Sequence, residues 1–199
     1  MIDAEEIQAL QDEWTARWHV PASPSSTLSA WATLIMQNHR SNFDLWHEED
    51  KARDPDATDA EIARVKRSID KLNQQRNDMV ERLDEISLQA CPNPRAHAPL
   101  HSETPGMMID RMSILALKIF HTVEQTQRSD AKEAHRLKNT ARLLVLQEQR
   151  GDLVACLASF WREAMSGDCR FKIYRQMKMY NDPELNPAIY KSLGRGKRD

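Results

Sequence analysis

The sequence has few residues that interrupt helices and no run long enough to cross a membrane. Only 5 of its 199 residues are glycine, whereas 29% are charged. Few glycines together with many charged helix formers are typical of an all-α protein. No segment approaches the roughly 20 consecutive apolar residues of a membrane span, so none is expected. The first ten residues are acidic and lack an apolar run, which argues against a signal peptide.

Neither sign of charge dominates, and paired cysteines are absent. The formal net charge is −2, so no broad electrostatic attraction to nucleic acid is expected. Cys91, Cys156 and Cys169 are widely spaced and form no CxxC pair. This pattern argues against a disulfide framework and a cysteine zinc site, and it favours a cytoplasmic location.

Capping signals and prolines predict a bundle of long antiparallel helices in one domain, 1–199. Thr58 and Glu61 form a capping box, and Thr104 precedes a proline at a first helical position. The segment 91–104 contains three prolines and is predicted to be a loop. We predict an N-terminal helix within 1–20, a bundle core over 27–165 with helices at about 27–53, 58–90, 104–128 and 130–165, a short C-terminal helix over 170–180, and an extended tail to 199. Candidate N-caps for the second helix are Ser25, Ser26 and Thr27.

The second and third predicted helices each have a seam, a row of apolar residues along one face, that is interrupted by polar residues. In the third helix the seam residues are spaced alternately three and four positions apart, and only Arg76 among them is polar. In the second helix, Asn38 and Asn42 occupy the seam. A short turn joins the two helices, so they should lie antiparallel, with Asn42 opposite Asp70 and Asn38 opposite Asn73. Arg76 should then be buried beside carboxylate or amide partners, because an unpaired buried charge is very costly.

The fourth predicted helix is apolar on nearly every side, as expected of a central, buried helix. Asp110, Arg111 and Lys118 are the charged residues of its stretch 107–123. Its N-terminus at Thr104 and Gly106 offers free backbone N–H groups that attract anions. The alternative is that Thr104 only caps the helix and that Asp110 pairs with an arginine of the preceding helix.

These residues predict a polar pocket between helices for an anionic, phosphorylated ligand. A magnesium-dependent phosphate-ester enzyme would use the same groups. The alternative is a structural polar layer that fixes helix register. A metal site in the loop, at His97, His101 and Glu103, is less favoured, since no cysteine is near it. The predicted catalytic groups are Glu49, Asp70 and Asp110, and the predicted ligand-binding groups are Asn42, Asn73, Arg76, Asn77, Thr104, Gly106, Arg111 and Lys118.

Four ordered blocks of sequence carry a resemblance to a known family. The blocks are Asn42–Arg53, Lys66–Asp78, Ser102–Leu115 and Tyr174–Pro183. Together they resemble the bacterial family catalogued as domain of unknown function 4254. The resemblance implies an all-helical cytoplasmic protein. It also implies either a nucleotide or sugar-phosphate ligand for the pocket, or the alternative function, a non-enzymatic adaptor of cell-envelope glycan assembly with a glycosyltransferase-type partner. Whether the chain is an enzyme, and whether it forms a homo-oligomer, stay open at this point.

Overall fold

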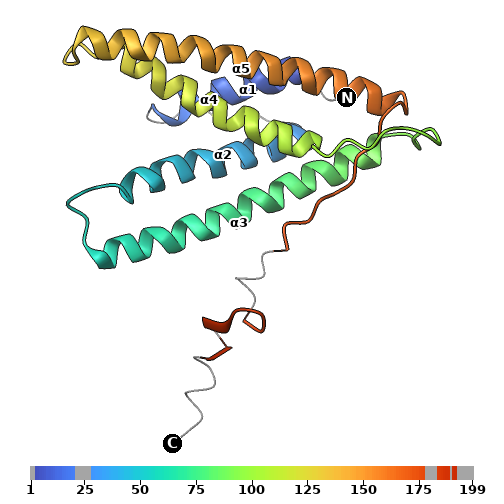
Figure 1. Ribbon diagram of the computed structural model, residues 1–199, viewed down its shortest axis with the longest axis horizontal. Helices are drawn as coiled ribbons and strands as arrows, with labels where there is room; N and C mark the ends of the chain where they lie inside the picture. The colour runs from blue at the N-terminus through green and yellow to red at the C-terminus, as the bar shows by residue number, and fades with distance from the viewer. Residues whose placement is uncertain (1–2, 21–27, 178–182, 189, 192–199) are drawn as a thin grey trace, which may run out of the picture.

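The computed structural model describes residues 3–20, 28–177, 183–188 and 190–191. The described residues form an all-α bundle, which confirms the predicted fold class (Figure 1). None of the described helices is both long and apolar enough to cross a membrane. The helices are α1 (Ala4–Trp18), α2 (Ala30–Lys51), α3 (Asp59–Ala90), α4 (Pro105–Gln127) and α5 (Glu133–Met165).

Local capping signals account for where several of these helices begin. The capping box of α3 is present, with the Thr58 N–H donating to Glu61 Oε2 at 2.8 Å and the Glu61 N–H donating to Thr58 Oγ1. Thr104 caps α4, and Pro105 occupies its first turn. Ser29 caps α2. The candidate caps Ser25, Ser26 and Thr27 lie outside the described residues.

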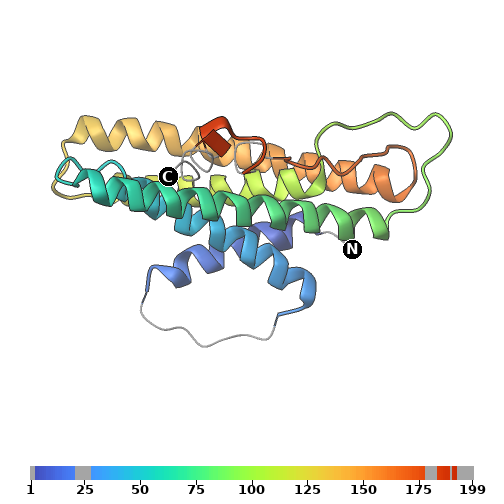
Figure 2. The ribbon, with the colours of Figure 1, turned by 90° about the horizontal axis from the view of Figure 1, so that it is seen from below.

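Two antiparallel helix pairs and one crossing helix make up the bundle. Helices α2 and α3 form one pair, α4 and α5 form the other, and α1 packs on α2, α4 and α5 (Figures 1 and 2). Helix α4 contacts each of the other four helices. Its apolar residues Met108, Ile109, Met112 and Leu117 are almost completely buried. The expectation of a central fourth helix is therefore confirmed.

The segment after α5 is extended, so the predicted helix over 170–180 is wrong for its described part, 170–177. The Arg170 N–H donates to Pro99 O at 3.0 Å, and the His101 N–H donates to Arg170 O at 2.8 Å. Phe171 is buried against Phe160. These contacts with the proline-containing loop satisfy backbone groups that a helix would have used internally.

Further along the chain, the same segment is hydrogen-bonded to α3. Arg175 donates to Glu81 Oε2 at 2.9 Å and to Glu85 Oε1 at 3.1 Å. The Gln176 N–H donates to Glu81 as well. The tail predicted to be extended contains a turn at 183–185 and helical residues at 187–188 and 190–191.

Candidate functional site

A buried polar layer joins α2, α3 and α4, centred on Asp110 of α4. Asn38 and Asn42 of α2 both donate to Asp110 Oδ1, at 3.0 and 2.9 Å. Arg76 of α3 lies on the other side, with its Nε 3.7 Å from the same oxygen. The polar interruptions of the helices therefore meet at one level, as the hairpin geometry predicted.

Arg76 was predicted to be buried and hydrogen-bonded to a carboxylate, and it differs from that prediction in both respects. Its side chain is 28% exposed, so it is only partly buried. Its Nε atom is shielded from solvent and has no hydrogen-bond partner in the part of the chain that the structure describes. At 3.7 Å the contact with Asp110 is an ion pair without a direct hydrogen bond. Arg76 thus balances the charge of Asp110 while its guanidinium keeps unused donors.

The layer continues inward as a hydrogen-bonded chain that reaches α1. Asn42 also donates to Ser113 Oγ at 3.0 Å, and Ser113 Oγ lies 2.7 Å from His39 Nδ1. His39 Nε2 lies 2.8 Å from Thr15 Oγ1, whose own proton is donated to the Gln11 carbonyl. Thr15 must therefore accept from Nε2, which leaves His39 Nδ1 to accept the Ser113 hydroxyl proton. Burial, and then the charge of Arg150, lower the pKa of His39 to about 3, so the ring is neutral.

Outside this layer a cleft of about 370 Å³ lies between α2, α3 and α4. It brings together four of the predicted site residues: Asn42, Glu49, Asn73 and Arg76. Glu49 is paired with Arg53, which lies directly after the C-cap of α2. The remaining lining residues are Leu45, Trp46, Asp50, Arg53, Ile114 and Leu117.

Two of the predicted residues on α3 do not line this cleft. Asp70 is exposed and pairs with Lys66 on the surface of its own helix, so its predicted place in the site is wrong. Asn77 is half-buried but is not among the lining residues. The cleft joins Asn42 to Asn73 and Arg76, about one turn further along α3 than the predicted partner Asp70.

The N-terminus of α4 is occupied by a carboxylate of the chain itself. Asp84 of α3 accepts from the Thr104 hydroxyl and from the Gly106 N–H, both at 2.6 Å. Asp84 is 2% exposed. The predicted anion site at Thr104 and Gly106 therefore holds an internal anion. The sequence prediction did not identify Asp84 as the residue that fills this site. The only signal in the sequence was Gly106, since a glycine at the start of a helix allows another group to approach the backbone closely.

In mildly acidic solution, the ionisations of Asp84 and His39 change the stability of the protein in opposite directions as the pH changes. Burial raises the pKa of Asp84 to about 6, although its hydrogen bonds act in the opposite direction. Its contribution to stability is complete below its unfolded pKa of 3.8 and is lost as the pH rises through about 6. The contribution of His39 is complete above 6.5 and is lost as the pH falls toward about 3.

Asp84→Asn should therefore make the protein more sensitive to acid. Between about pH 4 and pH 6 each group changes the free energy of unfolding by about 1.4 kcal/mol per pH unit, with opposite signs. Without Asp84, the His39 effect stands alone, and stability should fall more steeply on acidification than in the wild type. Urea unfolding at a series of pH values measures the two slopes. Parallel curves would mean that Asp84 is ionised in the folded protein throughout this range.

Arg111 and Lys118 lie on the other side of α4. Arg111 is exposed and paired with Glu103. Both basic residues line a cavity of about 610 Å³ between α4 and α5. Consecutive helical residues point about 100° apart, so Asp110 and Arg111 face different neighbours. The predicted single pocket is therefore wrong for Asn73 and Arg111, which line different cavities.

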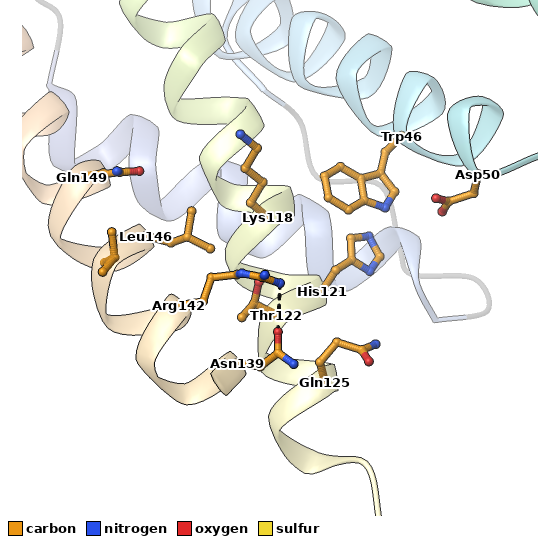
Figure 3. A pocket seen from close by; sticks show the side chains of 11 residues that line it. Trp46, Asp50, Lys118, His121, Thr122, Gln125, Asn139, Arg142, Leu146 and Gln149 are labelled. Atoms are coloured by element: carbon orange, nitrogen blue, oxygen red, sulfur yellow. Dashed lines mark hydrogen bonds between the residues drawn. The ribbon is translucent and has the colours of Figure 1, made fainter. Parts of the chain in front are cut away.

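A further cavity, of about 620 Å³, lies between α2, α4 and α5 (Figure 3). Arg142 of α5 lines it and donates to the buried Asn139 at 3.1 Å. Trp46 and Asp50 of α2 line both this cavity and the cleft that contains Arg76. His121 of α4 lies in its wall beside Trp46.

The fold and the cleft define an all-α bundle protein with a buried polar layer that meets solvent at Arg76. The chain belongs to the family described as protein of unknown function (DUF4254), whose model matches residues 32–173. This confirms the family resemblance. The matched range runs from α2 through α5 and includes Asn42, Arg76 and Asp110. No curated protein and no solved structure matches the chain.

Proposed function

We propose that the cleft between α2, α3 and α4 binds a small anionic ligand that carries a phosphate group, such as a nucleotide or sugar phosphate. The observation that carries this proposal is the position of Arg76 in the cleft and the lack of hydrogen bonds from its guanidinium to other described residues. Its guanidinium lines the cleft, its side chain is 28% exposed, and it makes no hydrogen bond to any other described residue. Guanidinium donors bind phosphate oxygens in pairs and with a favourable charge interaction.

The rest of the lining suits such a ligand. Asn73 lines the cleft and makes no side-chain hydrogen bond within the described part of the chain, so its amide is available to orient the ligand. Trp46 and Ile114 add apolar surface, on which a base or sugar ring can pack. Asp110 does not face the ligand as an acid or base in this scheme; it positions Arg76 through the ion pair.

A magnesium-dependent phosphate-ester reaction would draw on the acidic end of the cleft. Glu49 and Asp50 both line it, and carboxylates combined with phosphate oxygens are the ligands that Mg²⁺ prefers. Glu49 would have to release Arg53 to reach a metal ion. Magnesium should then increase the affinity for the phosphorylated ligand, and Glu49→Gln should remove that increase.

Arg76→Met tests the binding proposal. The substitution keeps the apolar stem and removes the charge, so affinity for the phosphorylated ligand should fall about 10- to 100-fold, as expected for a charge-assisted hydrogen bond. A thermal-shift screen of nucleotides and sugar phosphates, with and without Mg²⁺, identifies the ligand, and calorimetry measures the affinity.

Arg82→Met is the matched control, because Arg82 is an exposed arginine of the same helix. It should leave the affinity unchanged. Equal affinities of the wild type and Arg76→Met would contradict the proposal.

A non-enzymatic accessory role in cell-envelope glycan assembly, with a glycosyltransferase-type partner, is the second candidate. It draws support from an exposed apolar surface on α5. Leu137 and Leu144 are 63% and 64% exposed and, with Ala134 and Ala141, follow the spacing of three and four residues that suits a partner helix. If no compound of the screen binds, this surface becomes the better candidate, and Leu144→Lys is the variant with which to test partner binding.

A further inference from the structure

Three histidines from three different elements meet at the side of the bundle where α1 ends. They are His19 at the C-cap of α1, His47 of α2 and His121 of α4. One ring nitrogen from each lies within 4.8 Å of those of the other two. We infer that His19, His47 and His121 form a binding site for a divalent transition-metal ion of the Zn²⁺ type. This site is distinct from the cleft at Arg76 and does not depend on the function proposed for that cleft.

The hydrogen bonds of two of the rings fix which nitrogen is available. His19 Nδ1 lies 2.7 Å from the Thr15 carbonyl oxygen, and His121 Nδ1 lies 2.7 Å from Glu124 Oε2. Both partners are acceptors, so in both rings Nδ1 carries the proton. In a neutral ring the lone pair is then on Nε2. The Nε2 atoms of His19 and His121 are both shielded from solvent and have no hydrogen-bond partner among the described residues.

This arrangement is the one that metal ligands commonly have. A histidine bound to a metal usually donates its other N–H to a carboxylate or a backbone carbonyl, which orients the ring. His121 has the carboxylate partner, and His19 has the carbonyl partner.

Aromatic packing alone does not account for the cluster. His19 stacks on Phe120 with ring centroids 4.3 Å apart, and His121 stacks on Trp46 at 4.8 Å. The faces of these two rings are therefore occupied by other residues. Among themselves the three histidine rings are steeply inclined, at 65° to 86°. If the cluster only packed, two shielded nitrogens would stay unsatisfied, at a cost of about 1 to 3 kcal/mol each.

The ligand set indicates the kind of metal. Three imidazoles without a carboxylate suit Zn²⁺, Co²⁺, Ni²⁺ or Cu²⁺ better than Mg²⁺ or Ca²⁺. With metal–nitrogen bonds of about 2.0 Å, tetrahedral ligand atoms lie roughly 3.3 Å apart, so small rotations of the side chains would close the site. Three protein ligands leave a fourth position for water or another molecule. The adjoining cavity, which His121 lines, also contains Lys118 and Arg142, which suit an anionic molecule (Figure 3).

The test is metal binding by the full chain. Protein freed of metal with a chelator is titrated with Co²⁺, whose visible absorption reports tetrahedral coordination, and then with Zn²⁺ in competition. We expect one ion per chain, displacement of Co²⁺ by Zn²⁺, and a higher melting temperature with metal. Wild-type protein that takes up no stoichiometric Co²⁺ or Zn²⁺ would overturn the site.

His47→Ala should weaken binding by roughly 100-fold or more, since removal of a group that only supports a ligand already costs 10- to 100-fold. His97→Ala is the matched control, because it removes an exposed imidazole of the loop. It should leave affinity and stoichiometry unchanged. Unchanged affinity in His47→Ala would assign the metal to other surface groups and overturn the site.

Glu124→Ala provides a second test that touches no ligand. The Glu124 side chain is half exposed, so its loss should leave folding intact. Without its hydrogen bond to His121 Nδ1, the metal affinity should fall roughly 10- to 100-fold. This variant decides the question if His47→Ala does not fold. An affinity equal to that of the wild type would contradict the role of Glu124 and, with it, the tautomer on which the site rests.

Discussion

Gly106→Ala is expected to lower the free energy of unfolding by about 3 kcal/mol, the upper end of the usual cost of overpacking. A Cβ atom at this position would lie 2.5 Å from the Val80 carbonyl oxygen and 2.7 Å from Asp84 Oδ1. The carbonyl belongs to the backbone of α3 and cannot rotate away. Helix α4 would have to move from α3, which would also weaken the hydrogen bond from the Gly106 N–H to Asp84.

Gly151→Ala is the matched control, and it should raise the free energy of unfolding rather than lower it. Gly151 lies within α5, and a Cβ atom there would meet nothing within 4 Å. Alanine is favoured over glycine inside a helix by about 1 kcal/mol, so this variant should be more stable than the wild type. Urea unfolding of both variants, with circular dichroism as the readout, measures the two changes. Equal stabilities of the two variants would contradict the close approach of α3 and α4 at Gly106.

The helices and several of their ends could be predicted because their signals are local. Thr58 with Glu61, and Thr104 with Pro105, specify helix starts within a few residues. The segment over 170–177 could not be predicted in the same way. Its pattern of basic and aromatic residues would suit a short helix, but the structure instead pairs Arg170 with Pro99 and His101. A short helix is marginal by itself, so contacts with distant residues decide its conformation.

The polar layer was partly predictable, because the short turn between α2 and α3 fixes how those helices face each other. The predicted antiparallel packing places Asn42, Asn73 and Arg76 near one another, and the cleft contains all three. Asp70, the residue directly after the buried Ile69, lies instead on the surface. A step of one residue rotates a side chain by about 100°, so a small error in the phase of a long helix moves a residue from the seam to the surface.

Other parts of the candidate sites depend on pairs that are far apart in the sequence. Asp84 meets the start of α4 only because α3 and α4 cross there. The histidines 19, 47 and 121 come from three elements and share no spacing that a single-sequence pattern could reveal. The buried arginine of the bundle was also assigned to the wrong residue. The structure places Arg150, rather than Arg76, fully in the interior.

Arg150→Ala should lower the free energy of unfolding by about 3 to 5 kcal/mol, as the loss of one partner from a buried charged network usually does. Arg150 is 2% exposed and ties α5 to α1. It is ion-paired with Asp12, donates to the Gln8 carbonyl at 3.1 Å, and donates to Gln11 Oε1 at 3.3 Å. Removing it would leave these acceptors without their donor and would open a cavity of the size of its side chain.

Two further variants separate packing from hydrogen bonding at this position. Arg150→Met keeps most of the buried volume but no donor, so its cost should be smaller than that of alanine and still clearly measurable. Arg162→Ala removes an exposed arginine of the same helix and should cost less than about 1 kcal/mol. Chemical denaturation of the three variants gives the comparison. If Arg150→Ala were no more destabilising than Arg162→Ala, the network around Arg150 would not be what holds α1 against α5.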